Sequence, residues 1–280
     1  MPTLAQQPEP AQPHQARQTA ESFGTDPRRY DHARPAYPDD LVARVVAGSP
    51  GLEVLDVGCG TGIAARQFQA AGCTVLGVEP DARMADFARD RGLQVEVATF
   101  ESWEPAGRQY DAVIAAQSWH WVDPAAGAVK AAQVLRPSGR LAIFGHVFEP
   151  PAEVAEPFAE AYRRVAPDSP LSSQPARRPL EMYQAGYAKY AEAIRETAQF
   201  TDPEQWQFDW QRRYTRQEWL DLLPTTGGLT RLAPAPLAEI LAAVGDAIDA
   251  LGGTFTMHYT TLATTATHLP QHTPPTPPNA

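Results

Sequence analysis

The glycine-rich turn at residues 58–62 constrains this chain more than any other feature of its sequence. Residues 54–62 read Val-Leu-Asp-Val-Gly-Cys-Gly-Thr-Gly, so a short apolar run enters a turn with three glycines. A second apolar run, Thr74–Val78, ends at the acid Glu79. Glycines allow a ligand to lie against backbone N–H groups where a helix begins. An acid at the tip of the neighbouring strand is where a ribose presents its two hydroxyls. The pattern predicts a site for an adenosine-containing cofactor.

The glycine spacing distinguishes between two kinds of cofactor. A dinucleotide fingerprint is G-x-G-x-x-G/A, with its third small residue packed behind a pyrophosphate. Here the third glycine is Gly62, and Ile63 follows it. Asp56 also places a carboxylate where a pyrophosphate would be repelled, whereas a cationic sulfonium with a free amino group would be attracted. A nicotinamide-dependent oxidoreductase is therefore the disfavoured alternative.

Composition narrows the class of protein. The chain has 280 residues, 43% of them hydrophobic, which is enough to fill a core. Its formal net charge of −10 argues against a nucleic-acid partner held through phosphates. We find no signal peptide and no apolar run long enough to span a membrane. The two cysteines suit a reducing compartment, so we expect a cytoplasmic protein. No His, Cys or carboxylate spacing predicts a metal site.

The alternation of apolar strands and helical patterns predicts an α/β fold with a largely parallel sheet. We expect disordered tails at 1–20 and 269–280 around a single domain at 21–268. Within it we expect an N-terminal lid and helix at 21–52, a cofactor-binding core at 53–149, a helical insertion over the site at 150–200 and C-terminal strands and helices at 201–268. The predicted strands are 53–57, 74–78, 93–97, 111–115, 140–144, 205–215 and 254–267. The predicted helices are 39–47, 62–71, 82–91, 124–135, 181–199, 216–223 and 235–250.

Several motifs resemble one family. Asp-Val-Gly-Cys-Gly-Thr-Gly (56–62) is similar to motif I of the class I methyltransferases that use S-adenosylmethionine. Residues 77–84 and 135–141 resemble motifs of the small-molecule methyltransferases related to ubiquinone and menaquinone biosynthesis. Residues 30–38 and 116–123 resemble a subgroup that includes trans-aconitate methyltransferase-like proteins. The resemblance covers about residues 23–145. It implies a Rossmann-like sheet of seven strands, mostly parallel with one antiparallel strand, and helices on both faces.

The resemblance also implies roles for particular residues. Asp56 would help hold the cofactor's amino group, and Glu79 would accept hydrogen bonds from both ribose hydroxyls. At position 99 the family often has an acid beside adenine, whereas this chain has Thr99, although the N–H of Phe100 could serve adenine. The complete set of expected cofactor-binding residues is Tyr30, Arg34, Asp56, Gly58, Cys59, Gly60, Gly62, Glu79, Pro80, Met84, Thr99, Phe100 and Gln117.

Other residues leave two interpretations open. His120 is a candidate general base because histidine titrates near neutrality, or it only shapes the pocket. Trp119 and Trp121 would form a substrate cage, or belong to the core. Tyr37 is a further candidate substrate contact. Arg34 lies in a motif with prolines and tyrosines, and we expect residues 23–38, which show no helical periodicity, to act as a lid.

The sequence thus predicts a transferase that moves a methyl group from S-adenosylmethionine to a small organic molecule, with the acceptor atom open and a carboxylate among the options. We expect a monomer or homodimer without a nucleic-acid or membrane partner. A regulatory protein that binds the cofactor without methyl transfer is the alternative from another class. Turnover to S-adenosylhomocysteine would distinguish the two.

Overall fold

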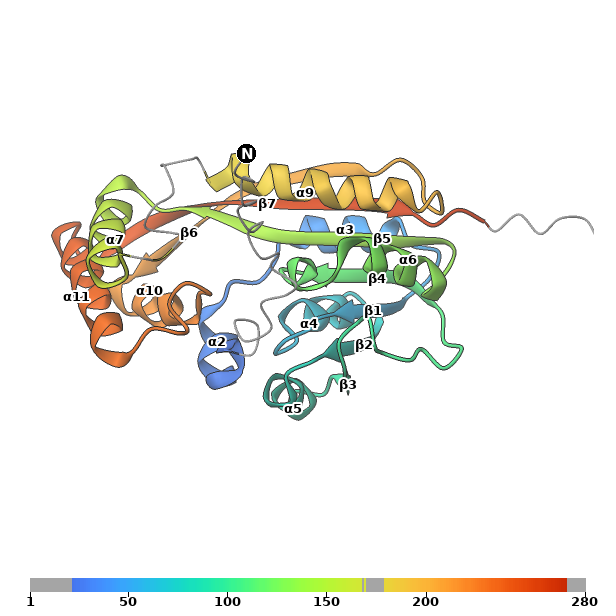
Figure 1. Ribbon diagram of the computed structural model, residues 1–280, viewed down its shortest axis with the longest axis horizontal. Helices are drawn as coiled ribbons and strands as arrows, with labels where there is room; N and C mark the ends of the chain where they lie inside the picture. Colours follow the sequence, from blue (N-terminus) through green and yellow to red (C-terminus); the bar gives the residue numbers. More distant parts are fainter. Residues whose placement is uncertain (1–21, 168, 170–178, 271–280) are drawn as a thin grey trace, which may run out of the picture.

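The computed structural model describes residues 22–167, 169 and 179–270, which form a seven-stranded sheet flanked by helices (Figure 1). The predicted tail 1–20 lies outside the described residues, as does 271–280 of the predicted tail 269–280, and residues 269–270 carry neither helix nor strand. The strands are β1 (Glu53–Val57), β2 (Thr74–Glu79), β3 (Gln94–Val97), β4 (Tyr110–Ala116), β5 (Leu135–Glu149), β6 (Glu204–Thr215) and β7 (Thr254–Thr267). The α-helices are α2 (Pro27–Ala33), α3 (Asp39–Ala47), α4 (Ile63–Ala70), α5 (Ala82–Asp90), α6 (Pro124–Val134), α7 (Ala152–Val165), α9 (Pro179–Glu196), α10 (Arg216–Leu222) and α11 (Pro234–Ala250). Three short 3-10 helices are η2 (Phe23–Thr25), η3 (Trp119–Trp121) and η4 (Leu223–Thr225).

The strand order is β3-β2-β1-β4-β5-β7-β6. Strands β1 to β5 pair in parallel, and β7 lies antiparallel between β5 and β6. The predicted fold, a mostly parallel Rossmann-like sheet with one antiparallel strand, is confirmed. The order reverses at β1, so the ends of β1 and β4 diverge at the edge where ligands bind in such sheets.

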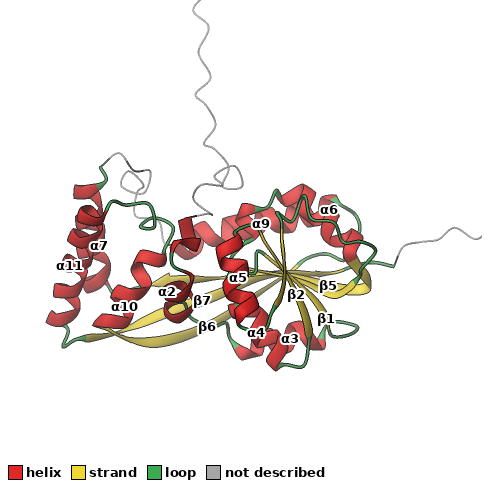
Figure 2. Ribbon diagram, turned by 90° about the horizontal axis from the view of Figure 1, so that it is seen from below, coloured by secondary structure: helices red, strands yellow, loops and turns green. Residues whose placement is uncertain are grey.

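Helices cover both faces of the sheet (Figure 2). On one face, α3, α4 and α5 pack Leu41, Phe68 and Ala85 against the central strands. On the other, α6 and α9 pack Ala131, Tyr187 and Ile194. Strands buried on both sides explain why β1 and β4 read as continuous apolar runs in the sequence.

Strand β5 is longer than the predicted 140–144 and carries the sheet beyond its parallel core. Beyond Phe144 it pairs only with β7, so β5, β7 and β6 continue as a three-stranded extension. Helices α7, α10 and α11 cover this extension with a separate apolar cluster that includes Trp219, Val244 and Tyr259 (Figure 1). Gly145 and His146 interrupt the apolar run in the sequence, but backbone pairing with Leu262 and Thr261 continues through them.

Two expectations about helices need correction. Residues 23–38 are not free of helix: they contain η2 and α2, because Pro27 begins α2 and the side chain of Asp26 caps it. A seven-residue helix is too short to show a periodic pattern. The segment 150–200 does not lie over the site as a unit. Helix α7 packs against α11 in the extension, and only α9 returns to the core.

The fold also bears on membrane association. None of the helices in the described part of the chain is long and apolar enough to cross a bilayer.

Candidate functional site

The predicted glycine turn lies at the carboxyl end of β1. Gly58, Gly60 and Gly62 all have positive φ values, of 66°, 55° and 85°, which L side chains rarely adopt. Gly58 is also confined by contact, because a Cβ there would lie 2.6 Å from the Cβ of Ser118. Ser118 follows β4, and its hydroxyl donates a hydrogen bond to the carbonyl of Val57. The turns after β1 and β4 are therefore in contact, and a side chain at position 58 would not fit between them.

Glu79 connects the glycine turn to the end of β2. Its Oε2 accepts a hydrogen bond from the N–H of Gly60 at 2.9 Å, and its Oε1 accepts one from the N–H of Asp81 at 3.0 Å. The side chain is buried, which raises the pKa of Glu79 to about 7 despite these two N–H donors. Both oxygens face the region where two vicinal hydroxyls could donate to them.

Asp56 is a buried acid without a compensating charge. It is fully buried, and neither of its oxygens has a hydrogen-bond partner of normal geometry among the described residues. Burial, and then the nearby carboxylate of Glu79, raise the pKa of Asp56 to about 7, and the N–H of Ala65 offsets only part of this. An orphaned buried carboxylate is costly for a protein that binds nothing there. The observation fits a ligand with a cationic centre.

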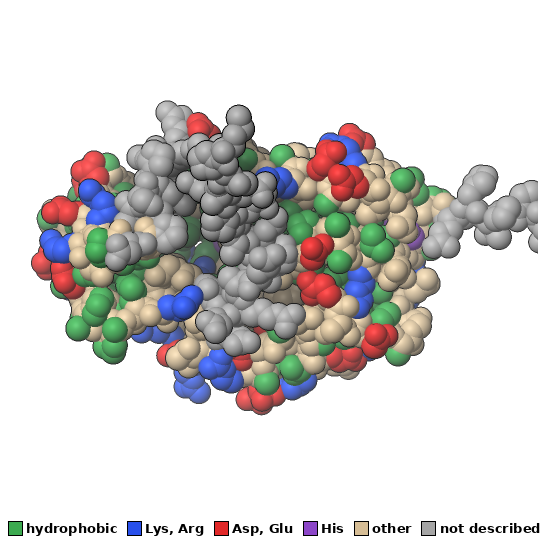
Figure 3. Space-filling model, in the orientation of Figure 1, with side chains coloured by type: hydrophobic (Ala, Val, Ile, Leu, Met, Phe, Trp, Pro, Cys, Tyr) green, Lys and Arg blue, Asp and Glu red, His purple; other side chains and the backbone are tan. Residues whose placement is uncertain are grey.

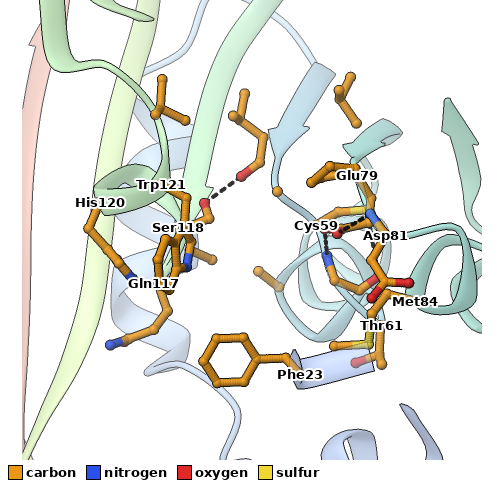
Figure 4. Close-up of a pocket in the computed structure, with 18 of the residues that line it drawn as sticks. Phe23, Cys59, Thr61, Glu79, Asp81, Met84, Gln117, Ser118, His120 and Trp121 are labelled. Carbon is orange, nitrogen blue, oxygen red and sulfur yellow. Dashed lines mark hydrogen bonds between the residues drawn. The ribbon is translucent and has the colours of Figure 1, made fainter. Parts of the chain in front are cut away.

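Gly58, Gly60 and Glu79 line a cavity of about 690 Å³, a size typical of ligand sites. Figure 4 shows Cys59, Glu79, Asp81 and Met84 on one side of it and Gln117, His120 and Trp121 on the other. The cavity brings together most of the sequence-predicted residues, namely Tyr30, Arg34, Tyr37, Gly58, Cys59, Gly60, Glu79, Pro80, Met84, Thr99, Phe100, Gln117, His120 and Trp121. Asp56 and Gly62 lie directly behind the lining, in β1 and at the start of α4.

The N-terminal segment closes one side of the cavity. Gly24 is packed so tightly that a Cβ there would lie 1.9 Å from a carboxylate oxygen of Asp81. Arg29 donates to the backbone carbonyl of Asp221 and forms an ion pair with its side chain at 3.2 Å, and Asp31 forms one with Arg66 at 2.6 Å. The segment therefore joins α10 of the extension to α4 and α5 of the core.

His120 faces the cavity without a strong partner. It makes no hydrogen bond within the described residues, and its ring lies 4.5 Å from that of Trp121. Burial lowers the pKa of His120 to about 4, so the imidazole is neutral at pH 7. A neutral imidazole can accept a proton, but one with so low a pKa is a weak base.

The two tryptophans of the Trp-His-Trp stretch separate. Trp121 lines the cavity, whereas Trp119 is 2% exposed and belongs to the core. A Cβ on Gly127 of α6 would lie 2.9 Å from the ring of Trp119, which shows how closely the indole is packed. Trp119 is therefore not a substrate contact.

Two further properties of the site concern Cys59 and metal ligands. Burial raises the pKa of the Cys59 thiol well above its ordinary value, which disfavours the thiolate that a nucleophile requires. Within the described residues, no group of three or more His, Cys, Asp or Glu side chains could hold a metal ion.

Sequence reasoning missed several lining residues. Phe23 lies between the two ends of the cavity (Figure 4), and Tyr183 of α9, Phe148 of β5 and the stretch Thr226–Gly227 complete the wall. These residues come from elements far apart in the chain and belong to no motif. Only the tertiary arrangement brings them to the site.

Gln117 is the residue of this wall with the least favourable backbone. Its φ is +60°, a conformation that is uncommon for residues other than glycine. It is held there because its N–H donates to the carbonyl of Phe144 and its Oε1 accepts from the N–H of His146. Such backbone outliers cluster at binding and catalytic sites.

Comparison with known proteins supports the interpretation of the fold and of the family. Residues 30–166 match the family described as a methyltransferase domain. An uncharacterized methyltransferase of Mycobacterium tuberculosis is 38% identical over 125 residues, which are 44% of this chain and 51% of that protein. A ubiquinone biosynthesis O-methyltransferase of Acinetobacter baylyi is 36% identical over 110 residues, 36% of this chain and 44% of that protein. The chain therefore spans about half the length of these curated relatives.

The fold is also found in solved structures. One from Anaeromyxobacter dehalogenans, described as a candidate type II methyltransferase, superposes with a TM-score of 0.61. It is 24% identical, and the alignment covers 85% of this chain and 99% of that one. At this identity the likeness establishes the fold.

The buried acid makes a testable prediction for the ligand-free protein. The folded-state pKa of Asp56 is raised from 3.8 to about 7. The protonated carboxyl group therefore contributes fully to the stability of the folded state below about pH 4, and this contribution is lost as the pH rises through 7. The variant Asp56→Asn cannot ionise. Its melting temperature relative to the parent protein should therefore increase from pH 5 to pH 8, measured by calorimetry. The exposed Asp86→Asn should show no such trend. A constant difference between Asp56→Asn and the parent across this range would contradict the burial of a charge.

Proposed function

We propose that this chain, which carries a class I S-adenosylmethionine-dependent methyltransferase domain, transfers a methyl group to a small organic molecule. The observation that carries the proposal is the pair of buried acids, Asp56 and Glu79, at the tips of β1 and β2. Both have raised pKa values, and a cationic ligand with a ribose would satisfy both. The matched relatives are named as methyltransferases, which supports the same reaction.

Different residues would bind the ribose, the amino group and the adenine of the cofactor. Glu79 would accept from the ribose hydroxyls while still accepting from the N–H of Gly60, since a carboxylate has about four lone-pair sites. Asp56 would face the amino group. Pro80, Met84 and Phe100 would pack against adenine, since they line the same end of the cavity. The hydroxyl of Thr99 already hydrogen-bonds to that of Ser102, so it is a poor substitute for an acid beside adenine.

Catalysis would depend on placement. When bound, S-adenosylmethionine supplies a methyl group that a sulfonium sulfur already activates. The protein must align the acceptor with that methyl group and exclude water, and this alone can remove much of the barrier. Phe23, Trp121 and Tyr183 provide apolar walls for this purpose. We propose that His120 accepts the acceptor's proton in those reactions where one must leave, because it is neutral at pH 7 and reaches the cavity.

The size and chemistry of the site favour a small acceptor. The N-terminal segment, α9 and the residues after α10 all contribute to the wall of the cavity, whose volume of about 690 Å³ suits a small molecule. On the outer face in Figure 3, acidic and basic side chains of the described residues are interspersed. Neither feature identifies the acceptor atom.

The first test concerns Glu79. S-adenosylhomocysteine should raise the melting temperature and NAD should not, because binding to the native state adds RT ln(1 + [L]/Kd). Glu79→Ala should weaken S-adenosylhomocysteine binding by about 1.5–3 kcal/mol in calorimetry, the range for hydrogen bonds to a charged group. The control is Glu153→Ala in α7, remote from the cavity. Unchanged affinity in Glu79→Ala would place the ribose elsewhere.

His120 makes a prediction with a distinctive pH dependence. If it is the base, His120→Ala should lower kcat by about 10²–10⁴-fold and leave S-adenosylhomocysteine affinity nearly unchanged. Because its pKa is about 4, the limb of the kcat profile that depends on His120 should fall only below about pH 5. A variant His120→Asn with most of the activity would show that His120 only shapes the pocket.

The N-terminal segment should respond to the cofactor. Bound S-adenosylhomocysteine should slow tryptic cleavage at Arg28 and Arg29, because the segment closes over the cavity when Phe23 has a ligand to pack against. Gly24→Ala should abolish this protection, since the added Cβ collides with Asp81. Cleavage at Arg163 and Arg164 in α7 is the internal control. Equal rates at Arg28 with and without ligand, measured by mass spectrometry, would refute the lid.

A further inference from the structure

Charged side chains of both signs line the cavity. Glu79 and Asp81 lie at the end of β2, and Glu101 follows β3. Among the described residues, Arg34 is the only Lys or Arg that lines the cavity. An anionic group on a second ligand would therefore find its cationic partner at Arg34.

Arg34 is held firmly but by neutral groups. Its Nε donates to the hydroxyl of Thr225 at 3.0 Å and its Nη2 donates to the carbonyl of the same residue at 2.5 Å. Its guanidinium lies 4.9 Å from the ring centre of Tyr30. Among the described residues no Asp or Glu forms an ion pair with it, in contrast to Arg29 and Asp221 nearby. The charge is therefore positioned without being neutralised.

The surroundings of Arg34 are aromatic. Tyr183 is partly withdrawn from water, which raises its pKa, and the charge of Arg34 offsets part of that rise. Burial likewise lowers the pKa of His146, and Arg34 adds to the effect. Arg34 is not among the groups that shift the pKa of Asp56 or Glu79. Burial raises the pKa of Tyr37, and the carboxylate of Asp56 adds to this rise. The charge of Arg34 offsets part of the rise, so the field of Arg34 reaches the aromatic residues around it.

We propose that Arg34 binds the carboxylate of the methyl acceptor, and that the acceptor is an otherwise apolar, ring-containing acid. A guanidinium presents paired N–H donors that match a carboxylate. The rings of Tyr37, Phe148 and Tyr183 offer flat apolar surface for the remainder of such a molecule. An ion pair within these walls is screened less than one at the surface. The inference rests on the proposed function, because it names the substrate class of the same site.

The test uses two fluorescent probes with the same rings. Anilinonaphthalene sulfonate is an aromatic anion, and phenylnaphthylamine lacks only the anionic group. In protein saturated with S-adenosylhomocysteine, the anion should bind more tightly than the amine, although the amine is the more apolar molecule. Arg34→Met should lower the affinity for the anionic probe by about 10- to 100-fold, the loss that corresponds to hydrogen bonds to a charged group. Its affinity for the amine should equal that of the parent protein. Arg34→Lys should restore part of the preference.

The matched control is Arg44→Met. The guanidinium of Arg44 also lies over an aromatic ring, 3.9 Å from the centre of Trp206, but outside the cavity. This variant should bind both probes as the parent does. If Arg34→Met fails to fold, the test is the ratio of the two probe affinities in the parent protein. Binding of the anion that equals or is weaker than binding of the amine then overturns the proposal.

Two other outcomes are informative. Arg34→Met could instead weaken the binding of S-adenosylhomocysteine by about 10-fold or more and leave the binding of the anionic probe unchanged. Arg34 would then hold the cofactor's own carboxylate, and the proposal would be wrong. If the parent protein does not bind S-adenosylhomocysteine, the proposed function fails. The probe comparison without cofactor then still reports whether Arg34 forms an anion site.

Discussion

The hydrogen bonds of Glu79 are the interaction on which the site depends. One carboxylate accepts from Gly60 after β1 and from Asp81 after β2, so it fixes two separate crossover turns relative to each other. Asp56 is buried nearby, and its pKa is raised by burial and then by the carboxylate of Glu79. A sheet of parallel strands buried on both faces supplies the stability that tolerates such a pair. The protein thus buries two acids at one edge of its sheet, which costs stability when no ligand is bound there.

Much of the fold could be predicted because the sequence carries local signals for it. The alternation from β1 to β4 and the caps Asp81 and Asp123 gave element bounds that agree with the structure to within one or two residues. The short helix α2 was missed because seven residues are too few for periodicity. The length of β5 was missed because its second half is stabilised by pairing with β7, which the local sequence does not encode.

Some residues of the candidate site could likewise be predicted from local sequence, and others could not. Gly58, Gly60 and Glu79 could be found because their spacing along the chain reflects one strand-turn-helix-strand unit. Tyr183, Thr226 and Gly227 could not, since they reach the cavity from distant parts of the chain, α9 and the stretch after η4. Those residues also lie beyond 30–166, the region that matches the methyltransferase family. The matched region nevertheless supplies lining residues on both sides of the cavity, including Glu79 and His120, and the residues beyond it complete the wall.

The extension formed by β5, β7 and β6 has its own apolar cluster, separate from those that flank the parallel core. Thr225 and Gly227 follow α10 of this extension, and Phe148 belongs to its first strand. Substitutions that repack the extension can therefore move Phe148 and Gly227 at the wall of the cavity without changing the apolar cluster that contains Cys59 of the glycine turn. The shape of the cavity is thus set by two separately packed parts of one sheet.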